Sequence, residues 1–168
     1  MDTANYFSAC DKVMKVLSTQ GAFLTVKDRT GKVNVMTIGW ALLGIVWRDP
    51  ILMVAVRPSR YTFGLLENAD DFTVTIPFSD MGKELVFCGT YSGSKVDKFK
   101  EGGLNTIFAK KVNSPIIDIK NARHYECKIV QMSALDKKRL NGQYDEKLYQ
   151  DRQYHTYYFG KISDCYET

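Results

Sequence analysis

Residues 33–47, VNVMTIGWALLGIVW, place the strongest constraint on the fold of this chain. The run is rich in β-branched and aromatic residues and is too apolar for a surface helix, so it favours a strand. Gly39 and Gly44 interrupt it, and a glycine inside a strand typically marks a bend or a bulge. We therefore expect one strand that bends within residues 33–47.

The remaining sequence predicts further strands and a few short helices. Apolar and β-branched runs predict strands at 21–28, 51–56, 71–77, 124–135 and 154–163, with a turn at Gly31. Helices are predicted within residues 59–71, within residues 79–89 and from Ser94 to residue 103. The second helix would begin at Ser79 or Asp80 and end at Gly89. Residues 5–20 are expected to form a short helix or an irregular arm, and residues 136–153 a polar loop.

These predicted strands do not alternate regularly with helices, which argues against a parallel doubly wound sheet. A mainly β fold fits better, with an antiparallel barrel that is closed or nearly closed and a few short helices inserted in it. The chain has 168 residues, of which 45% are hydrophobic and 25% are charged. We expect it to form a single globular domain spanning residues 1–168.

Composition and charge exclude several classes of function. The net charge of +4 comes from scattered lysines, so no nucleic-acid partner is expected. No signal peptide is predicted, and the longest uncharged apolar stretch, 38–47, is too short for a membrane span, so we expect a cytoplasmic protein. Four dispersed cysteines and two histidines, His124 and His155, predict free thiols and no metal site.

Familiar catalytic motifs are also missing. The chain has no GxGxxG, GxSxG or HExxH, and GTYSGSK at 89–95 has the wrong spacing for a P-loop. We therefore assign no catalytic side chain.

The segment VRPSRYTF, residues 56–63, is the first candidate ligand-binding element. Arg57, Ser59, Arg60, Tyr61 and Thr62 would converge at the start of a helix, where amides and guanidinium groups bind phosphate. A plain helix start with solvated arginines explains the same residues equally well.

Two other segments have similar potential. Residues 88–99, CGTYSGSKVDKF, combine small and hydroxylic residues with Lys95 and Lys98, which suits a phosphate, although a plain helix connection explains them too. Residues 34–40, NVMTIGW, would offer a strand edge and Trp40 to a flat heteroaromatic ligand, whereas ordinary core packing is the simpler explanation.

Taken in order, these segments with FTVTIP, ECKIVQ and HTYYFGKI resemble the flavin reductase-like FMN-binding family, especially its flavoredoxin type. The resemblance extends from about Gly21 to Ile162. It implies an FMN-binding split barrel that forms a homodimer, with flavin sites near the subunit interface.

The resemblance also implies roles for individual residues. The isoalloxazine ring would be lined by Asn34, Met36, Thr37, Ile38, Gly39 and Trp40. The phosphate end would be held by Arg57, Ser59, Tyr61 and Thr62 and closed over by Ser92, Gly93 and Lys98. Arg57 is the preferred phosphate ligand, whereas Arg60 could equally reach the phosphate or lie in solvent. His155 could lie near the open face of the flavin or be an ordinary barrel histidine.

The implied function is an FMN-dependent oxidoreductase, either a flavin reductase or a flavoredoxin-like electron carrier. It would pass hydride or electrons from NADH, NADPH or a partner redox protein through bound FMN to an acceptor. The alternative is a flavin- or nucleotide-binding module without turnover on the same barrel.

Overall fold

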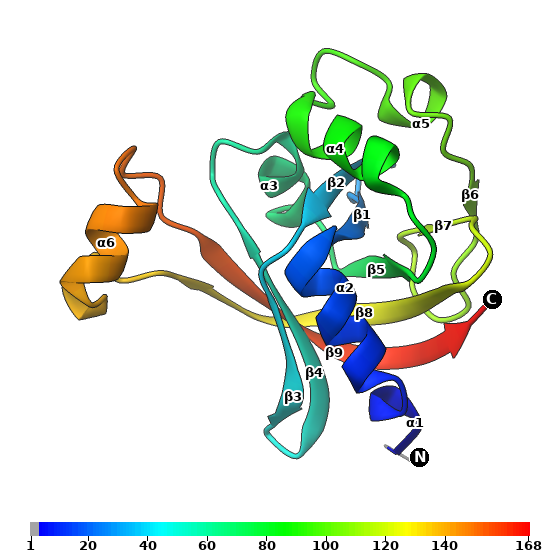
Figure 1. Ribbon diagram of the computed structural model, residues 1–168, viewed down its shortest axis with the longest axis horizontal. Coiled ribbons are helices and arrows are strands. Elements are labelled where there is room, and N and C mark those ends of the chain that lie inside the picture. The colour runs from blue at the N-terminus through cyan, green and yellow to red at the C-terminus, as the bar shows by residue number, and fades with distance from the viewer. Residues whose placement is uncertain (1–3) are drawn as a thin grey trace.

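The computed structural model describes residues 4–168. A seven-stranded antiparallel sheet dominates it, with the strand order β2-β1-β5-β8-β9-β4-β3 (Figure 1). These strands are β1 Ala22–Lys27, β2 Val33–Ile38, β3 Ala41–Val46, β4 Asp49–Val56, β5 Asp71–Pro77, β8 Ala122–Ala134 and β9 Thr156–Glu167. A separate two-stranded ribbon pairs β6, Thr106–Ile107, with β7, Ile116–Ile117. The predicted mainly β, antiparallel fold is confirmed.

The helices are short. They are α1 Ala4–Phe7, α2 Cys10–Thr19, α3 Tyr61–Leu66, α4 Gly82–Thr90, α5 Lys98–Glu101 and α6 Gly142–Leu148, with one 3-10 turn, η1, at Lys137–Arg139. None of the helices in residues 4–168 is long and apolar enough to cross a membrane.

The predicted bent strand at 33–47 is in fact two strands, β2 and β3, which lie at opposite edges of the sheet. Only Gly39 and Trp40 connect them, so the Cα atoms of Ile38 and Ala41 are at most about 11 Å apart. In a flat sheet the six intervening strand spacings would separate these edges by about 29 Å. The sheet must therefore curl until its edges approach each other, and the hydrogen bond from the Ala55 N–H to the Trp40 carbonyl, 3.1 Å, extends the β3–β4 ladder into the link.

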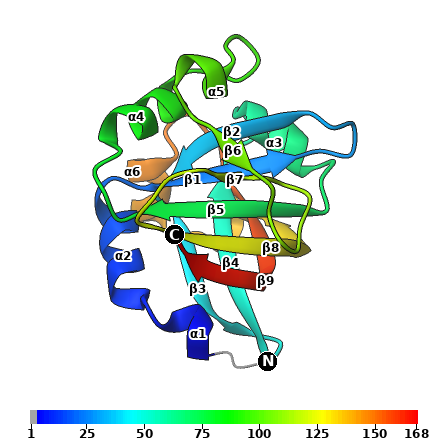
Figure 2. The ribbon, with the colours of Figure 1, turned by 90° about the vertical axis from the view of Figure 1, so that its right-hand side faces the viewer.

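The core fills the inside of the curled sheet. Leu24, Val54, Phe72, Tyr125 and Tyr158 are fully buried there, and α2 contributes Val13 and Leu17 at one end (Figure 2). A second apolar cluster lies between β1, β2 and α4, where Phe23 and Val35 pack with Leu85. β1 is thus buried on both faces, which explains its nearly continuous apolar sequence.

Three helical predictions need correction. The N-cap position of α4 is Met81 and not Ser79 or Asp80, although the Asp80 carboxylate accepts a hydrogen bond from the Gly82 N–H at 2.9 Å. The Met81 N–H donates to the side chain of Gln20, and Gly89 lies inside the helix. α5 begins only at Lys98, because Asp97 and not Ser94 caps it.

The third correction concerns the predicted polar loop at 136–153, which contains α6. This helix starts after Asn141, whose side chain accepts a hydrogen bond from the Gln143 N–H. It projects from the barrel between β8 and β9 (Figure 1).

Candidate functional site

Two adjoining hollows lie beside the seam between β2 and β3. The first, here called the inner cavity, has a volume of about 60 Å³. It is lined by Asn34, Met36, Ser59, Arg60, Tyr61, Thr62, Cys88, Gly89, Thr90, Tyr91, Ser92, Gly93 and Lys98. The second, the outer hollow, is an open depression of about 400 Å³ lined by Met36, Thr37, Ile38, Gly39, Trp40, Ala55, Arg57, Arg60 and His155. Met36 and Arg60 belong to both, so the hollows are parts of one site.

Hydroxyl groups and cations surround the inner cavity. Thr62 is buried, and its hydroxyl accepts a hydrogen bond of 2.8 Å from the side-chain amide of Asn34, which leaves the Thr62 O–H to donate. Ser92 and Ser94 share a hydrogen bond of 2.9 Å that holds the loop above the cavity. The cavity has room for a few water molecules or one phosphate-sized anion. Among the described residues lining either hollow there is no carboxylate, so the site favours anions.

The backbone at Gly93 lies so close to the side chains of Asn34 and Tyr61 that it leaves no room for a Cβ atom. A Cβ atom at this position would lie 2.0 Å from Oδ1 of Asn34 and 3.0 Å from the ring of Tyr61. Only glycine therefore allows the 92–94 loop to close on β2 and α3.

Lys98 holds the wall of the cavity together. Its ammonium group donates to the carbonyl oxygens of Val35, at 3.0 Å, and Cys88, at 2.6 Å, and thereby ties β2 to α4. Two of its three N–H groups are used in this way, and one remains for a ligand. Burial lowers the pKa of Lys98, and burial also raises the pKa of the Cys88 thiol to about 11, so this thiol is neutral at pH 7.

The two arginines of the RPSR segment have different positions. Arg60 lines both hollows and donates to the Gly89 carbonyl at 3.1 Å. Arg57 lines the outer hollow only, and its guanidinium donates to the Asp151 carboxylate, at 2.6 Å, and to the Leu148 carbonyl, at 2.9 Å. Arg60 rather than Arg57 therefore lies beside the inner cavity, and the choice of Arg57 as the preferred phosphate ligand stays a prediction.

Aromatic rings form one wall of the outer hollow. The Trp40 ring lies 4.6 Å from the His155 ring, centroid to centroid, and the Tyr149 hydroxyl is 2.9 Å from Nδ1 of His155. Burial, with a smaller effect of Arg57 and Arg60, lowers the pKa of His155 to about 4. At pH 7 the imidazole is therefore neutral, and the positive charge of this hollow comes from the arginines.

Comparison with known proteins identifies this architecture. The model of the flavin reductase like domain matches residues 14–168. The chain belongs to this family. It is 34% identical over 100 residues to an uncharacterized protein of Archaeoglobus fulgidus, in a match that covers 60% of the chain and 55% of that relative. An uncharacterized protein of Pyrococcus abyssi is 27% identical over 150 residues, 88% of this chain and 74% of the relative.

Solved structures of the family have the same fold. A flavoredoxin of Desulfovibrio vulgaris superposes with a TM-score of 0.68 at 22% identity, over 89% of this chain and 70% of that one. A flavoredoxin of Methanosarcina acetivorans superposes with a TM-score of 0.66 at 25% identity, over 89% of this chain and 68% of that one. An FMN-binding protein of Thermus thermophilus superposes with a TM-score of 0.63 at 22% identity, over 88% of this chain and 69% of that one. The predicted family and the split-barrel fold are confirmed.

All the site residues that the family resemblance implies line one of the two hollows, whereas Lys95 lines neither. Sequence reasoning missed Tyr149 and Asp151, which approach the outer hollow from the segment expected to be a polar loop. The tyrosines at 144, 149 and 154 were the available signal, because such a density of aromatic residues is unusual in a solvated loop.

The buried histidine at the outer hollow predicts a specific pH dependence. Between about pH 6.5 and pH 4, His155 is protonated in the unfolded chain but stays neutral in the folded protein. The free energy of unfolding therefore falls as the pH falls through this range. We expect His155→Gln to reduce the loss of this free energy between pH 7 and pH 4.5 by about 1–3 kcal/mol relative to the wild type. Urea unfolding at both pH values measures the effect. An unchanged loss would show that His155 titrates normally.

Proposed function

We propose that this protein binds FMN and acts as a flavin-dependent oxidoreductase of the flavin reductase or flavoredoxin type. It would pass hydride or electrons from NAD(P)H or a protein donor to an acceptor. One observation carries this proposal. The inner cavity is the size of a phosphate and has no carboxylate in its lining, and it adjoins an open hollow with aromatic rings in its wall; Met36 and Arg60 line both. A flavin mononucleotide has this same combination of a small dianion and a large planar ring.

The inner cavity suits the FMN phosphate. Arg60 and the remaining N–H of Lys98 supply charge, and Ser59, Thr62 and Ser92 supply hydroxyl donors. The glycine at position 93 lets the loop close over the anion. Because Asn34 and Lys98 are held by partners within the protein, these donors are in place before a ligand arrives.

The edge of β2 suits the isoalloxazine ring. The Val35 carbonyl points away from β1 to Lys98, so the backbone groups of Thr37, two residues further along, point to the same open side. These groups would meet the polar rim of the ring, and Met36, Ile38 and Trp40 would provide its apolar surface. FMN supplies the redox chemistry when it is bound, while the protein provides position and electrostatics.

The purified protein should be yellow, with flavin absorption that survives dialysis or returns when FMN is added. Anaerobic addition of NADH or NADPH should bleach this absorption if a nicotinamide is the donor. A protein that takes up no FMN would refute the proposal. A protein that binds FMN but resists reduction by both nicotinamides and by reduced ferredoxin would support a flavin-binding module without turnover instead.

Arg60→Ala should weaken the binding of FMN by about 10- to 100-fold and the binding of riboflavin by less than about threefold. The reason is that riboflavin lacks the phosphate, and one charge-assisted hydrogen bond contributes on the order of 1.5–3 kcal/mol. Fluorescence titration of both ligands measures the ratio. Arg57→Ala is the matched comparison, because Arg57 is outside the inner cavity and should affect both ligands alike. Selective loss of FMN in Arg57→Ala alone would reverse these roles.

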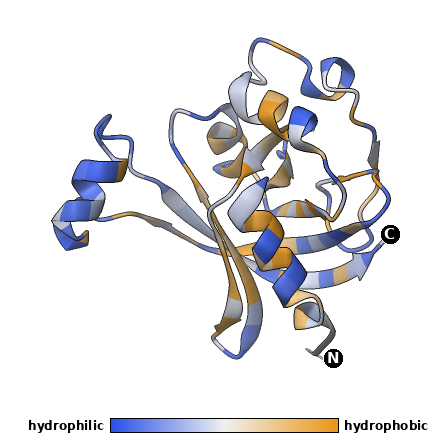
Figure 3. Cartoon of the chain, in the orientation of Figure 1, coloured by the Kyte–Doolittle hydropathy of each residue, from blue (hydrophilic) through white to orange (hydrophobic). Residues whose placement is uncertain are grey.

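We also propose a homodimer that uses the outer face of the β3–β4 hairpin, the apolar ribbon segment in Figure 3. Leu42 is 66% exposed and Trp47 is 61% exposed on this hairpin. Trp47 and Arg48 both have positive φ, at 53° and 64°, an unfavourable conformation for bulky residues that places the indole at the tip. An exposed apolar surface of this kind typically marks an interface.

Leu42→Lys should convert the dimer to a monomer in sedimentation velocity, because it places a charge in the apolar interface. Val86→Lys is the control, since Val86 is 69% exposed on α4, away from the hairpin (Figure 1). A monomeric wild-type protein, or equal effects of both variants, would contradict the proposed interface.

A further inference from the structure

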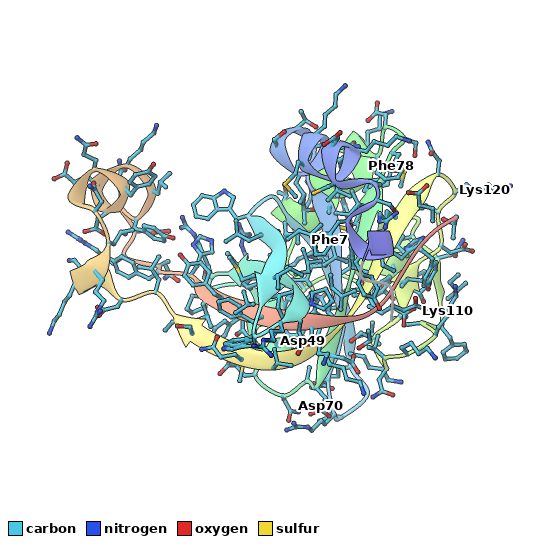
Figure 4. The ribbon with its side chains drawn as sticks, turned by 90° about the horizontal axis from the view of Figure 1, so that it is seen from below. Phe7, Asp49, Asp70, Phe78, Lys110 and Lys120 are labelled. Atoms are coloured by element: carbon cyan, nitrogen blue, oxygen red, sulfur yellow. The ribbon has the colours of Figure 1, made fainter. Side chains whose placement is uncertain are left out.

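The segment 135–155, here called the arm, carries α6 away from the barrel between β8 and β9 (Figures 1 and 4). Its two ends are joined by the hydrogen bond from the Leu135 N–H to the His155 carbonyl, 2.9 Å. Asp145 holds the arm together, because its carboxylate accepts from the Tyr154 hydroxyl at 2.6 Å and pairs with Arg152 at 3.2 Å. These contacts tie α6 to the segment that returns to β9.

Among residues 4–168, one barrel side chain, Arg57, holds the far part of the arm by polar contacts. Arg57 pairs with Asp151 at 2.6 Å and donates to the Leu148 carbonyl at 2.9 Å. Its guanidinium also lies 5.5 Å from the centroid of the Tyr149 ring. With these contacts made, the planar guanidinium is oriented toward the arm and not toward the inner cavity.

The contacts of Arg57 continue into the outer hollow. Tyr149 is only 2% exposed, and its hydroxyl meets Nδ1 of His155. The His155 ring in turn packs on Trp40, and the Tyr149 ring meets Trp40 edge-on with centroids 6.5 Å apart. The position of the arm therefore determines how Tyr149 and His155 stand against Trp40.

We propose that Arg57 is a positioning residue which, through Asp151, holds Tyr149 behind His155 and Trp40, so that these two rings form a fixed wall that admits one planar ring beside the flavin. The substrate class is a planar aromatic or quinoid electron donor or acceptor. The identity of the ligand rests on the proposed FMN function, whereas the link from Arg57 to Trp40 does not. Because the Arg57–Asp151 pair is partly exposed, it adds little to overall stability, and its main effect is on the position of the arm.

The first test uses the protein without flavin. Trp47→Phe leaves Trp40 as the only tryptophan. In this background Asp151→Asn should raise the quenching of Trp40 fluorescence by acrylamide about twofold, because the wall loosens. Asp136→Asn is the matched control, because it removes the same charge from the arm at an equally exposed position, at 52%. The contacts of the Asp136 carboxylate, to Arg139 and to the Lys138 N–H, both lie within the arm. Arg57→Lys, whose single nitrogen replaces the two guanidinium nitrogens that donate to Asp151 and Leu148, should repeat the effect of Asp151→Asn.

The second test uses the FMN-loaded protein reduced with dithionite and mixed anaerobically with an oxidant. Menadione is a planar quinone that takes two electrons and two protons to become its hydroquinone, whereas each ferricyanide takes one electron without stacking. Asp151→Asn should raise the apparent Kd of menadione at least threefold, leave the ferricyanide rate unchanged, and leave FMN affinity within twofold. Asp136→Asn should match the wild type throughout.

The results separate the two levels of the proposal. Equal quenching in Asp151→Asn and Asp136→Asn would overturn the positioning role of Arg57. If Asp151→Asn changed the quenching of Trp40 but left the apparent Kd of menadione unchanged, the proposed selection of a planar ring would be overturned. A protein that binds no FMN would refute the proposed function, and the quenching result would still decide whether Arg57 controls the wall.

Discussion

The two-residue link between β2 and β3 is the constraint on which the rest of this structure depends. Gly39 and Trp40 must join the opposite edges of a seven-stranded sheet, and a link this short requires the sheet to curl. Curling encloses the core, but β2 and β3 separate at the seam instead of pairing with each other. The edge of β2 is therefore left open, and it is at this edge that both hollows lie.

The seam also explains why the site draws on distant parts of the sequence. Closure brings β2 against α3, so Asn34 meets Thr62, and it brings Trp40 beside His155 just before β9. Helix α4 then covers β2 from outside and is tied to it by the buried ammonium group of Lys98. A ligand at this place would be held by residues whose positions are already fixed by barrel closure, which would reduce the ordering cost of binding.

The sequence predicts the parts of this arrangement that depend on local pattern. The strands, the hydroxyl-rich loops and the residues lining the hollows follow from composition and from the family resemblance. The break at Gly39 does not, because a bend inside one strand and a passage between two edges give the same local sequence pattern. The contact of Gln20 with the Met81 N–H and the contact of Asp151 with Arg57 are long-range, and no periodicity reveals which side chain will supply them.

The RPSR segment shows most clearly where local reasoning ends. Arg57 and Arg60 are both cations near a short helix, and on sequence alone Arg57 is the more natural anion ligand because it directly follows β4. Their different surroundings come from elements far along the chain: Gly89 of α4 receives one guanidinium, and Asp151 of the arm receives the other. An arginine bound to a carboxylate within the protein is a poor ligand for a second anion, since the ligand would have to displace that carboxylate. The assignment of an anion site therefore depends less on where cations occur than on which of them the fold leaves without a carboxylate partner.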